Sequence, residues 1–180
     1  TRQFLKFNNN FYFYTSDGVS GVELWKSDGT ESGTTLVKDI RSGSIGSDPT
    51  LFTVFGDHLY FSAKDEEYGE ELWRTDGTES GTTLVKDIYT GSDFFAPEGV
   101  TVFGDHLYFT AKNEEYGYEL WRTDGTESGT TLVKDINSGS EGSSISYLTV
   151  SQNKLFFAAK DSTYGWALWK TDGTESGTVL

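Results

Sequence analysis

The apolar residues of the strand-like segments stand next to one another instead of alternating with polar ones. Leu72 and Trp73 are neighbours, and residues 59–61 form an unbroken apolar run, Leu-Tyr-Phe. Because successive side chains of a strand point to opposite faces, such segments carry large apolar groups on both faces of a sheet. A sheet with one face in water would alternate instead. The pattern therefore predicts sheets that other sheets cover on both sides.

Polar and glycine-containing segments divide residues 49–96 into four predicted strands. These strands are Leu51–Phe55, His58–Ala63, Glu70–Thr75 and Thr82–Ile88. Residues 76–81 between the last two strands predict a turn, because Asp-Gly favours positive φ and chain reversal. Residues 89–96 are predicted to cross over to the next unit. No segment shows helical periodicity over the length that a helix needs.

This pattern recurs four times along the chain. The run Leu-Trp-Arg-Thr-Asp-Gly-Thr-Glu-Ser-Gly-Thr at residues 72–82 returns almost unchanged at residues 24–34, 120–130 and 168–178, always 48 residues apart. We expect one repeat domain over residues 1–180, with units of approximately 1–48, 49–96, 97–144 and 145–180, the last one truncated. Four-stranded antiparallel sheets at this spacing predict an all-β fold, a β-propeller of four blades. The blades would close a four-bladed ring or form a segment of a larger propeller or assembly.

A named repeat family shares this motif. The run Glu-Leu-Trp-x-x-Asp-Gly-Thr at Glu23–Thr30, Glu71–Thr78 and Glu119–Thr126 resembles the bacterial ELWxxDGT repeat, and in the fourth copy Ala167 replaces the Glu. The resemblance covers essentially the whole chain. It implies β-propeller-type repeat arrays on large exported bacterial proteins, and hence an extracellular or cell-surface location. It implies no defined biochemical activity.

The recurring Leu-Trp pairs are the predicted structural core of the repeat. They are Leu24, Trp25, Leu72, Trp73, Leu120, Trp121, Leu168 and Trp169. We expect them to fill the space between neighbouring sheets; the alternative is an aromatic platform that stacks sugars on each blade. Trp166 is an additional aromatic residue found only in the fourth unit. It is expected to be partly exposed and is the candidate ligand-binding residue.

Four aspartates open the recurring turns: Asp28, Asp76, Asp124 and Asp172. Their carboxylates are expected to accept backbone N–H bonds across the turn. The alternative is a Ca²⁺ site at each turn, built from Asp and Glu oxygens and backbone carbonyls. The loop lacks the alternating Asp spacing of an EF-hand, so we expect no metal and no cofactor.

The composition and the net charge limit the classes of binding partner and of activity that we expect for this chain. The net charge is −14, with 28 acidic against 14 basic residues, which disfavours nucleic acid and anionic lipid. No apolar run is long enough to insert into a membrane. There is no cysteine, so there is no disulfide and no thiolate metal site. No serine or histidine stands in a recognisable catalytic pattern, so we expect no enzyme.

Two functions remain. The first is a non-catalytic extracellular scaffold or an interaction or adhesion module, joined to further blades, to other copies of itself or to other proteins. The alternative is a multivalent carbohydrate-binding propeller that binds glycans through aromatic residues in the clefts between blades. The fourth unit lacks the counterpart of residues 133–136, so its last strand is expected to be cut short. We expect the ends to be joined to another blade.

Overall fold

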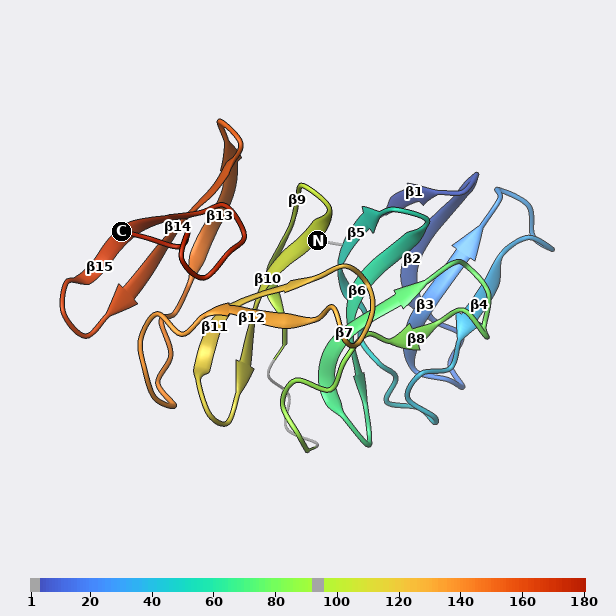
Figure 1. Ribbon diagram of the computed structural model, residues 1–180. Coiled ribbons are helices and arrows are strands. Elements are labelled where there is room, and N and C mark those ends of the chain that lie inside the picture. Colours follow the sequence, from blue (N-terminus) through green and yellow to red (C-terminus); the bar gives the residue numbers. More distant parts are fainter. Residues whose placement is uncertain (1–3, 92–95) are drawn as a thin grey trace. The chain divides into compact units, whose positions relative to one another are not determined.

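The computed structural model describes residues 4–91 and 96–180 (Figure 1). These residues form strands and contain no helix, and so none that could cross a membrane. The chain divides into two compact units. One comprises residues 1–87 and 91–94, and the other comprises residues 88–90 and 95–180. Each unit holds two antiparallel sheets and is described by itself.

The first unit contains two four-stranded sheets in which consecutive strands are neighbours. The first sheet consists of β1 (Leu5–Phe7), β2 (Asn10–Ser16), β3 (Val22–Ser27) and β4 (Thr35–Lys38). The second sheet consists of β5 (Thr50–Phe55), β6 (His58–Asp65), β7 (Gly69–Thr75) and β8 (Thr83–Leu84). Both are simple meanders, which short turns between adjacent strands allow.

The second unit repeats this arrangement. Its first sheet consists of β9 (Glu98–Phe103), β10 (His106–Asn113), β11 (Gly117–Thr123) and β12 (Thr131–Lys134). Its second sheet has three strands, β13 (Ser146–Ser151), β14 (Lys154–Asp161) and β15 (Gly165–Thr171), followed by an isolated antiparallel bridge between Lys170 and Val179. The predicted all-β class and its repeated antiparallel sheets are confirmed. Closure into a ring stays a prediction.

The fourth strand of each four-stranded sheet is shorter than predicted. Residues 82–88 were expected to form a strand, but β8 covers only Thr83–Leu84. In the first sheet the register shifts, since Trp25 pairs with Leu36 whereas Leu24 pairs with Lys38. Such a bulge bends a strand and ends its pairing. The Glu23 carboxylate then accepts the N–H of Arg41, so a side chain replaces the strand partner.

The two sheets of each unit meet through the recurring Leu-Trp pair. In the first unit, Leu24 of β3 and Trp73 of β7 belong to one buried cluster that also contains Leu59 and Phe61 of β6. In the second unit, Leu120, Trp169, Leu155 and Phe157 form the equivalent cluster. Because adjacent strand residues face opposite sides, the Leu of the first sheet in each unit faces the second sheet, and the Trp of the second sheet faces back toward the first.

The burial of the predicted core residues depends on their place in this arrangement. Six of them are buried: Leu24, Leu72, Leu120, Trp73, Trp121 and Trp169. Trp25 is only half-buried. The prediction is wrong for Leu168, of which 66% is exposed. Leu168 projects from the face of the last sheet that is opposite to the Trp169 cluster, and no described sheet covers that face.

Candidate functional site

The four recurring turns have the same hydrogen bonds. In the turn that begins at Asp124, Oδ1 accepts the backbone N–H of Thr126 at 2.8 Å and its hydroxyl at 2.7 Å. The Thr126 hydroxyl oxygen in turn accepts the N–H of Gly129 at 2.9 Å. Equivalent bonds close the turns that begin at Asp28, Asp76 and Asp172. The predicted acceptance of backbone N–H groups by these carboxylates is confirmed.

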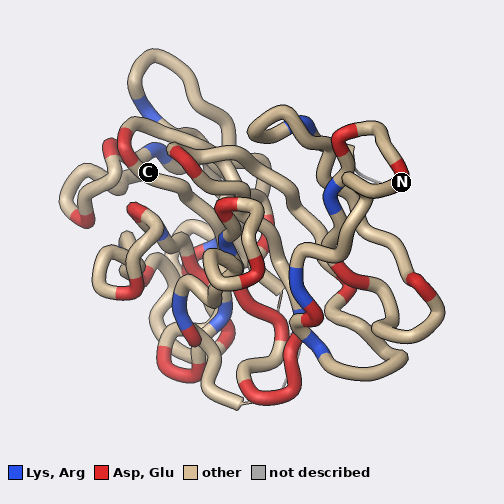
Figure 2. The backbone as a smooth tube through the Cα atoms, turned by 90° about the vertical axis from the view of Figure 1, so that its right-hand side faces the viewer, with Lys and Arg blue, Asp and Glu red and all other residues tan. Residues whose placement is uncertain are grey.

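The same hydrogen bonds lower the pKa values of the turn aspartates, which lie on exposed loops (acidic residues are red in Figure 2). Hydrogen bonds from Thr174 hold the pKa of Asp172 at about 2, and bonds from Thr126 lower the pKa of Asp124. The carboxylates are therefore ionised, and Oδ1 of each is engaged by two donors of its own loop. Among the described residues, no group of three or more potential metal-ligating side chains gathers at one place.

The turns also hold neighbouring sheets together. In the first unit, Lys26 Nζ of β3 donates to the carbonyl of Gly77 in the next sheet's turn at 2.7 Å. In the second unit, Arg122 Nη1 of β11 donates to the carbonyl of Gly173 at 2.8 Å. Both glycines have positive φ. A side chain there would also collide with a tyrosine hydroxyl of the preceding sheet, that of Tyr12 against Gly77 in the first unit.

A second cation contacts the other end of these two turns. Lys38 Nζ donates to the carbonyl of Thr82 at 2.9 Å, and Lys134 Nζ donates to the carbonyl of Thr178 at 2.9 Å. The turns that begin at Asp76 and Asp172 are thus each bound at two points by cationic side chains of the preceding sheet. Hydrogen bonds from a charged donor are stronger than those between neutral groups. The turn is a connection between sheets as well as a reversal of the chain.

The glutamate of the recurring motif is buried, which the sequence analysis did not foresee. Glu119 Oε2 accepts the Ser143 hydroxyl at 2.6 Å and Oε1 accepts the N–H of Asn137 at 3.1 Å. Glu23 binds Ser47 and the N–H of Arg41 in the same way. Burial raises the pKa of Glu119 to about 7. Each carboxyl group attaches the crossover segment that leads to the next sheet.

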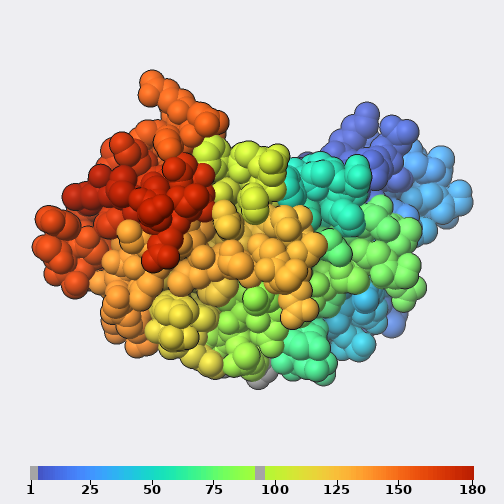
Figure 3. All heavy atoms as spheres, viewed as in Figure 1, coloured from blue at the N-terminus to red at the C-terminus, as the bar shows by residue number. Residues whose placement is uncertain are grey.

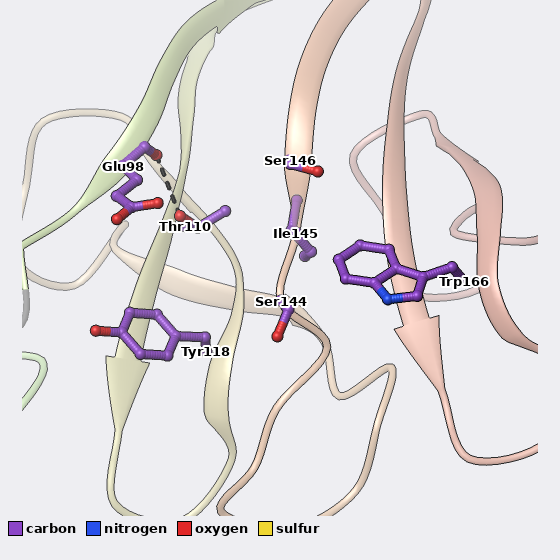
Figure 4. A pocket seen from close by; sticks show the side chains of 7 residues that line it. All are labelled: Glu98, Thr110, Tyr118, Ser144, Ile145, Ser146 and Trp166. Carbon is purple, nitrogen blue, oxygen red and sulfur yellow. Dashed lines mark hydrogen bonds between the residues drawn. The ribbon is translucent and has the colours of Figure 1, made fainter.

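A cleft in the second unit contains the candidate ligand-binding residue Trp166 (Figure 4). Its volume is about 410 Å³, which falls in the usual range of small-molecule sites, roughly 300–1,000 Å³. The described residues that line it are Glu98, Thr110, Tyr118, Ser144, Ile145, Ser146 and Trp166. The Trp166 side chain is 59% exposed, and its ring extends toward Ile145. The cleft thus combines hydroxyl groups, one carboxylate and an exposed indole.

The first unit has a smaller counterpart of this cleft. It has a volume of about 200 Å³ and is lined by Tyr14, Val22, Asp48, Pro49 and Thr50. These residues stand 96 positions before Thr110, Tyr118, Ser144, Ile145 and Ser146. The smaller Thr110 in place of Tyr14 leaves more room in the second unit. The sequence singled out Trp166 but missed the other lining residues, because they come from two different sheets.

Comparison with known proteins shows a similarity of fold to solved structures. No family model and no curated protein matches the chain. A prolyl endopeptidase structure matches with a TM-score of 0.60 and 13% identity, over 99% of this chain and 26% of that one. A puromycin hydrolase matches with a TM-score of 0.57 and 14% identity, over 91% of this chain and 25% of that one. Oligopeptidase B from Leishmania major matches with a TM-score of 0.57 and 15% identity, over 99% and 26%.

The chain thus spans about a quarter of the length of each of these solved structures. The matches include propeller-type proteins. Because the identities are this low, the likeness concerns the fold alone.

Proposed function

We propose that the chain is a non-catalytic repeat module, a segment of a propeller-type array that serves as a structural scaffold or as an interaction or adhesion domain. The observation that carries this proposal is the use of the recurring motif to join sheets. In each unit the turn of the second sheet is held by cations of the first sheet, as in the bond from Lys26 to the Gly77 carbonyl. The recurring turn residues, which could otherwise suggest a repeated chemical site, thus connect neighbouring sheets.

The other positions of the motif support the same proposal. Glu119 attaches the crossover segment, Leu120 packs toward the following sheet and Trp169 packs toward the preceding one. Asp124 closes the turn. The contacts of Glu119, Leu120 and Trp169 fix one sheet relative to its neighbour within the unit, whereas that of Asp124 fixes the shape of its own turn. A module built in this way presents a rigid surface and offers its outer sheets to further partners.

The resemblance to exported bacterial repeat arrays supports an extracellular or cell-surface location for this module. The solved structures with TM-scores above 0.5 support the propeller-type arrangement of its sheets. Its partners in this proposal are further blades, other copies of the chain or other proteins. The strongly acidic composition disfavours nucleic acid as a partner.

The Trp166 cleft favours a second candidate function, carbohydrate binding. An exposed indole next to hydroxyl groups and a carboxylate is suited to a sugar, whose apolar ring face and hydroxyls it can contact. The described lining residues include Glu98 and no basic side chain, so neutral sugars fit better than acidic ones. Trp166 is replaced by Val22, Glu70 and Tyr118 in the other units. Multivalent binding through this indole would therefore require several copies of the chain.

A glycan array distinguishes the two functions. The wild-type chain is compared with Trp166→Ala, which removes the exposed indole, and with Thr110→Tyr, which introduces the residue that the first unit carries at the equivalent position. The scaffold proposal expects no binding above background by any of the three proteins. Binding to several neutral glycans that share one sugar, lost in both variants, would contradict the scaffold and establish the carbohydrate site.

A further inference from the structure

Two sheet faces are exposed although their counterparts elsewhere in the chain are packed. We call the exposed face of the last sheet, formed by Phe156, Leu168 and Lys170, the tail face (the last sheet is orange to red in Figure 3). We call the exposed face of the first sheet, formed by Phe4, Phe11, Phe13 and Trp25, the head face. Exposed contiguous apolar surface of this kind is a mark of interaction sites.

Each unit contains one packed example of a tail face against a head face. In the first unit, Leu24 of the first sheet packs in one cluster with Leu59 and Phe61 of the second. In the second unit, Leu120 packs in one cluster with Leu155 and Phe157. The 48-residue register shows which exposed residues correspond to these packed ones. The packed contact between the two sheets of each unit is therefore a template for how an exposed tail face and an exposed head face could pack together.

The tail face has the residues of the template in the right places. Leu168 occupies the position of Leu24 and Leu120, both fully buried, yet 66% of Leu168 is exposed. Phe156 and Lys170 occupy the positions of Tyr12 and Lys26. A hollow of about 200 Å³ lies on this face, lined by Phe156, Leu168, Trp169, Lys170 and Leu180. The hollow leaves room for apolar side chains of an opposing sheet.

The head face corresponds in the same way to the packed face of the second sheet. Phe11 and Phe13 occupy the positions of Leu59 and Phe61, and Phe4 occupies the position of Phe52. Phe4 is 65% and Phe11 is 52% exposed. The rings of Phe4 and Phe13 lie 5.7 Å apart, so these residues form one aromatic patch. Removing such a patch from water is the main driving force of association.

We propose that the tail face of one copy of this chain receives the head face of a second copy, in the arrangement that joins the two sheets of each unit. The inference rests on the proposed scaffold function and names its partner. The two faces are different, so the contact is heterologous, and repetition of it closes a ring or extends a filament.

The template also assigns a polar contact to this interface. Lys26 donates to the carbonyl of Gly77, and the equivalent pair across the new interface is Lys170 with Gly29 of the second copy. Gly29 has a φ of 95°, as Gly77 has 97°, so its turn has the conformation that receives the lysine. Phe156 has no hydroxyl to place against this turn, unlike Tyr12. The lysine is therefore the polar contact that we expect to fix the register.

Two charge substitutions test the proposal without threatening the fold. Leu168→Glu alters the tail face and Phe11→Glu alters the head face; both residues are already exposed. Val19→Glu is the matched control, since Val19 is 74% exposed in a loop outside both faces. Sedimentation velocity is measured for each protein alone and for an equimolar mixture of Leu168→Glu with Phe11→Glu.

We expect assembly by the wild type and by the control, and a monomer for each face variant alone. The mixture should form a dimer and stop there, because only the intact tail of one variant and the intact head of the other can pair. A monomeric wild type, an unpaired mixture, or loss of assembly in only one face variant would overturn the proposal. None of these outcomes involves glycans, so a positive glycan array with intact assembly contradicts the scaffold function alone.

Discussion

The recurring turn depends on a close contact between the aspartate that opens it and the glycine five residues later. A Cβ at Gly129 would fall on the carboxylate of Asp124, and the same is true of Gly33 with Asp28. The carboxylate cannot move aside freely, because it accepts two hydrogen bonds from Thr126. Gly129 is thus required by space, whereas Gly125 is required by its φ of 96°.

This contact leads to a testable coupling. Gly129→Ala should lower the free energy of unfolding by about 1–3 kcal/mol, since the new methyl group displaces Asp124 from its bonds. Asp124→Ala should cost a similar amount. The double variant should cost about as much as Asp124→Ala alone, because the obstructing carboxylate is then gone. Denaturant unfolding of the four proteins measures the cycle, and additive costs would show that the two residues do not interact.

At the scale of single residues, the sequence predicted the chemistry of Asp124 but not the reason for Gly129. The affinity of aspartate for turn N–H groups is a local property, whereas the space around Gly129 depends on the folded loop. The burial of Glu119 also escaped prediction. A glutamate normally lies in water, and only its position two residues before Trp121, on the same face of the strand, signalled that it points inward.

Among the elements, the crossover segments depend on this buried carboxyl group. Glu119 binds Ser143 and the N–H of Asn137, which lie on the segment between β12 and β13. Burial favours the neutral form and raises the pKa of Glu119 to about 7, above the ordinary value of 4.5. The folded state therefore binds a proton that the unfolded state releases between these pH values.

The sign of the resulting pH dependence follows from this difference. Stabilisation by protonated Glu119 is complete below about pH 4.5 and is lost as the pH rises through about 7. The Glu119→Gln side chain stays neutral at every pH. Relative to this variant, the free energy of unfolding of the wild type should fall by up to roughly 3 kcal/mol as the pH rises from about 4.5 to about 7. Urea unfolding of both proteins at several pH values measures the loss. A difference between the two proteins that stays constant with pH would show that folding does not raise the pKa of Glu119.

The elements themselves were largely predictable. The first three strands of the second sheet were expected within two residues of their observed bounds, because Gly-Asp and Asp-Gly turns delimit them. The fourth strand was predicted too long, since the pattern at residues 82–88 gives no sign that strand pairing ends at Leu84. The cleft beside Trp166 was not predictable beyond the exposed indole, because Thr110 and Ser144 meet only after two sheets have packed.

At the scale of the whole molecule, identical local sequence has different surroundings. Leu24 and Leu168 belong to the same recurring motif, but Leu24 is covered by a following sheet and Leu168 is not. The local sequence predicts that the leucine of the motif is buried, whereas its actual burial depends on whether another sheet packs on that face. This contrast between equivalent positions is the basis for the head-to-tail association that we propose.

The measurement that tests this account most directly is the mass of the unmodified 180-residue chain in solution, obtained by light scattering over a wide range of concentration. Stacking of the tail face on the head face of another copy predicts a species of at least twice the chain mass of 20.0 kDa, with the larger species favoured as concentration rises. A single species of 20.0 kDa at every concentration would contradict the account.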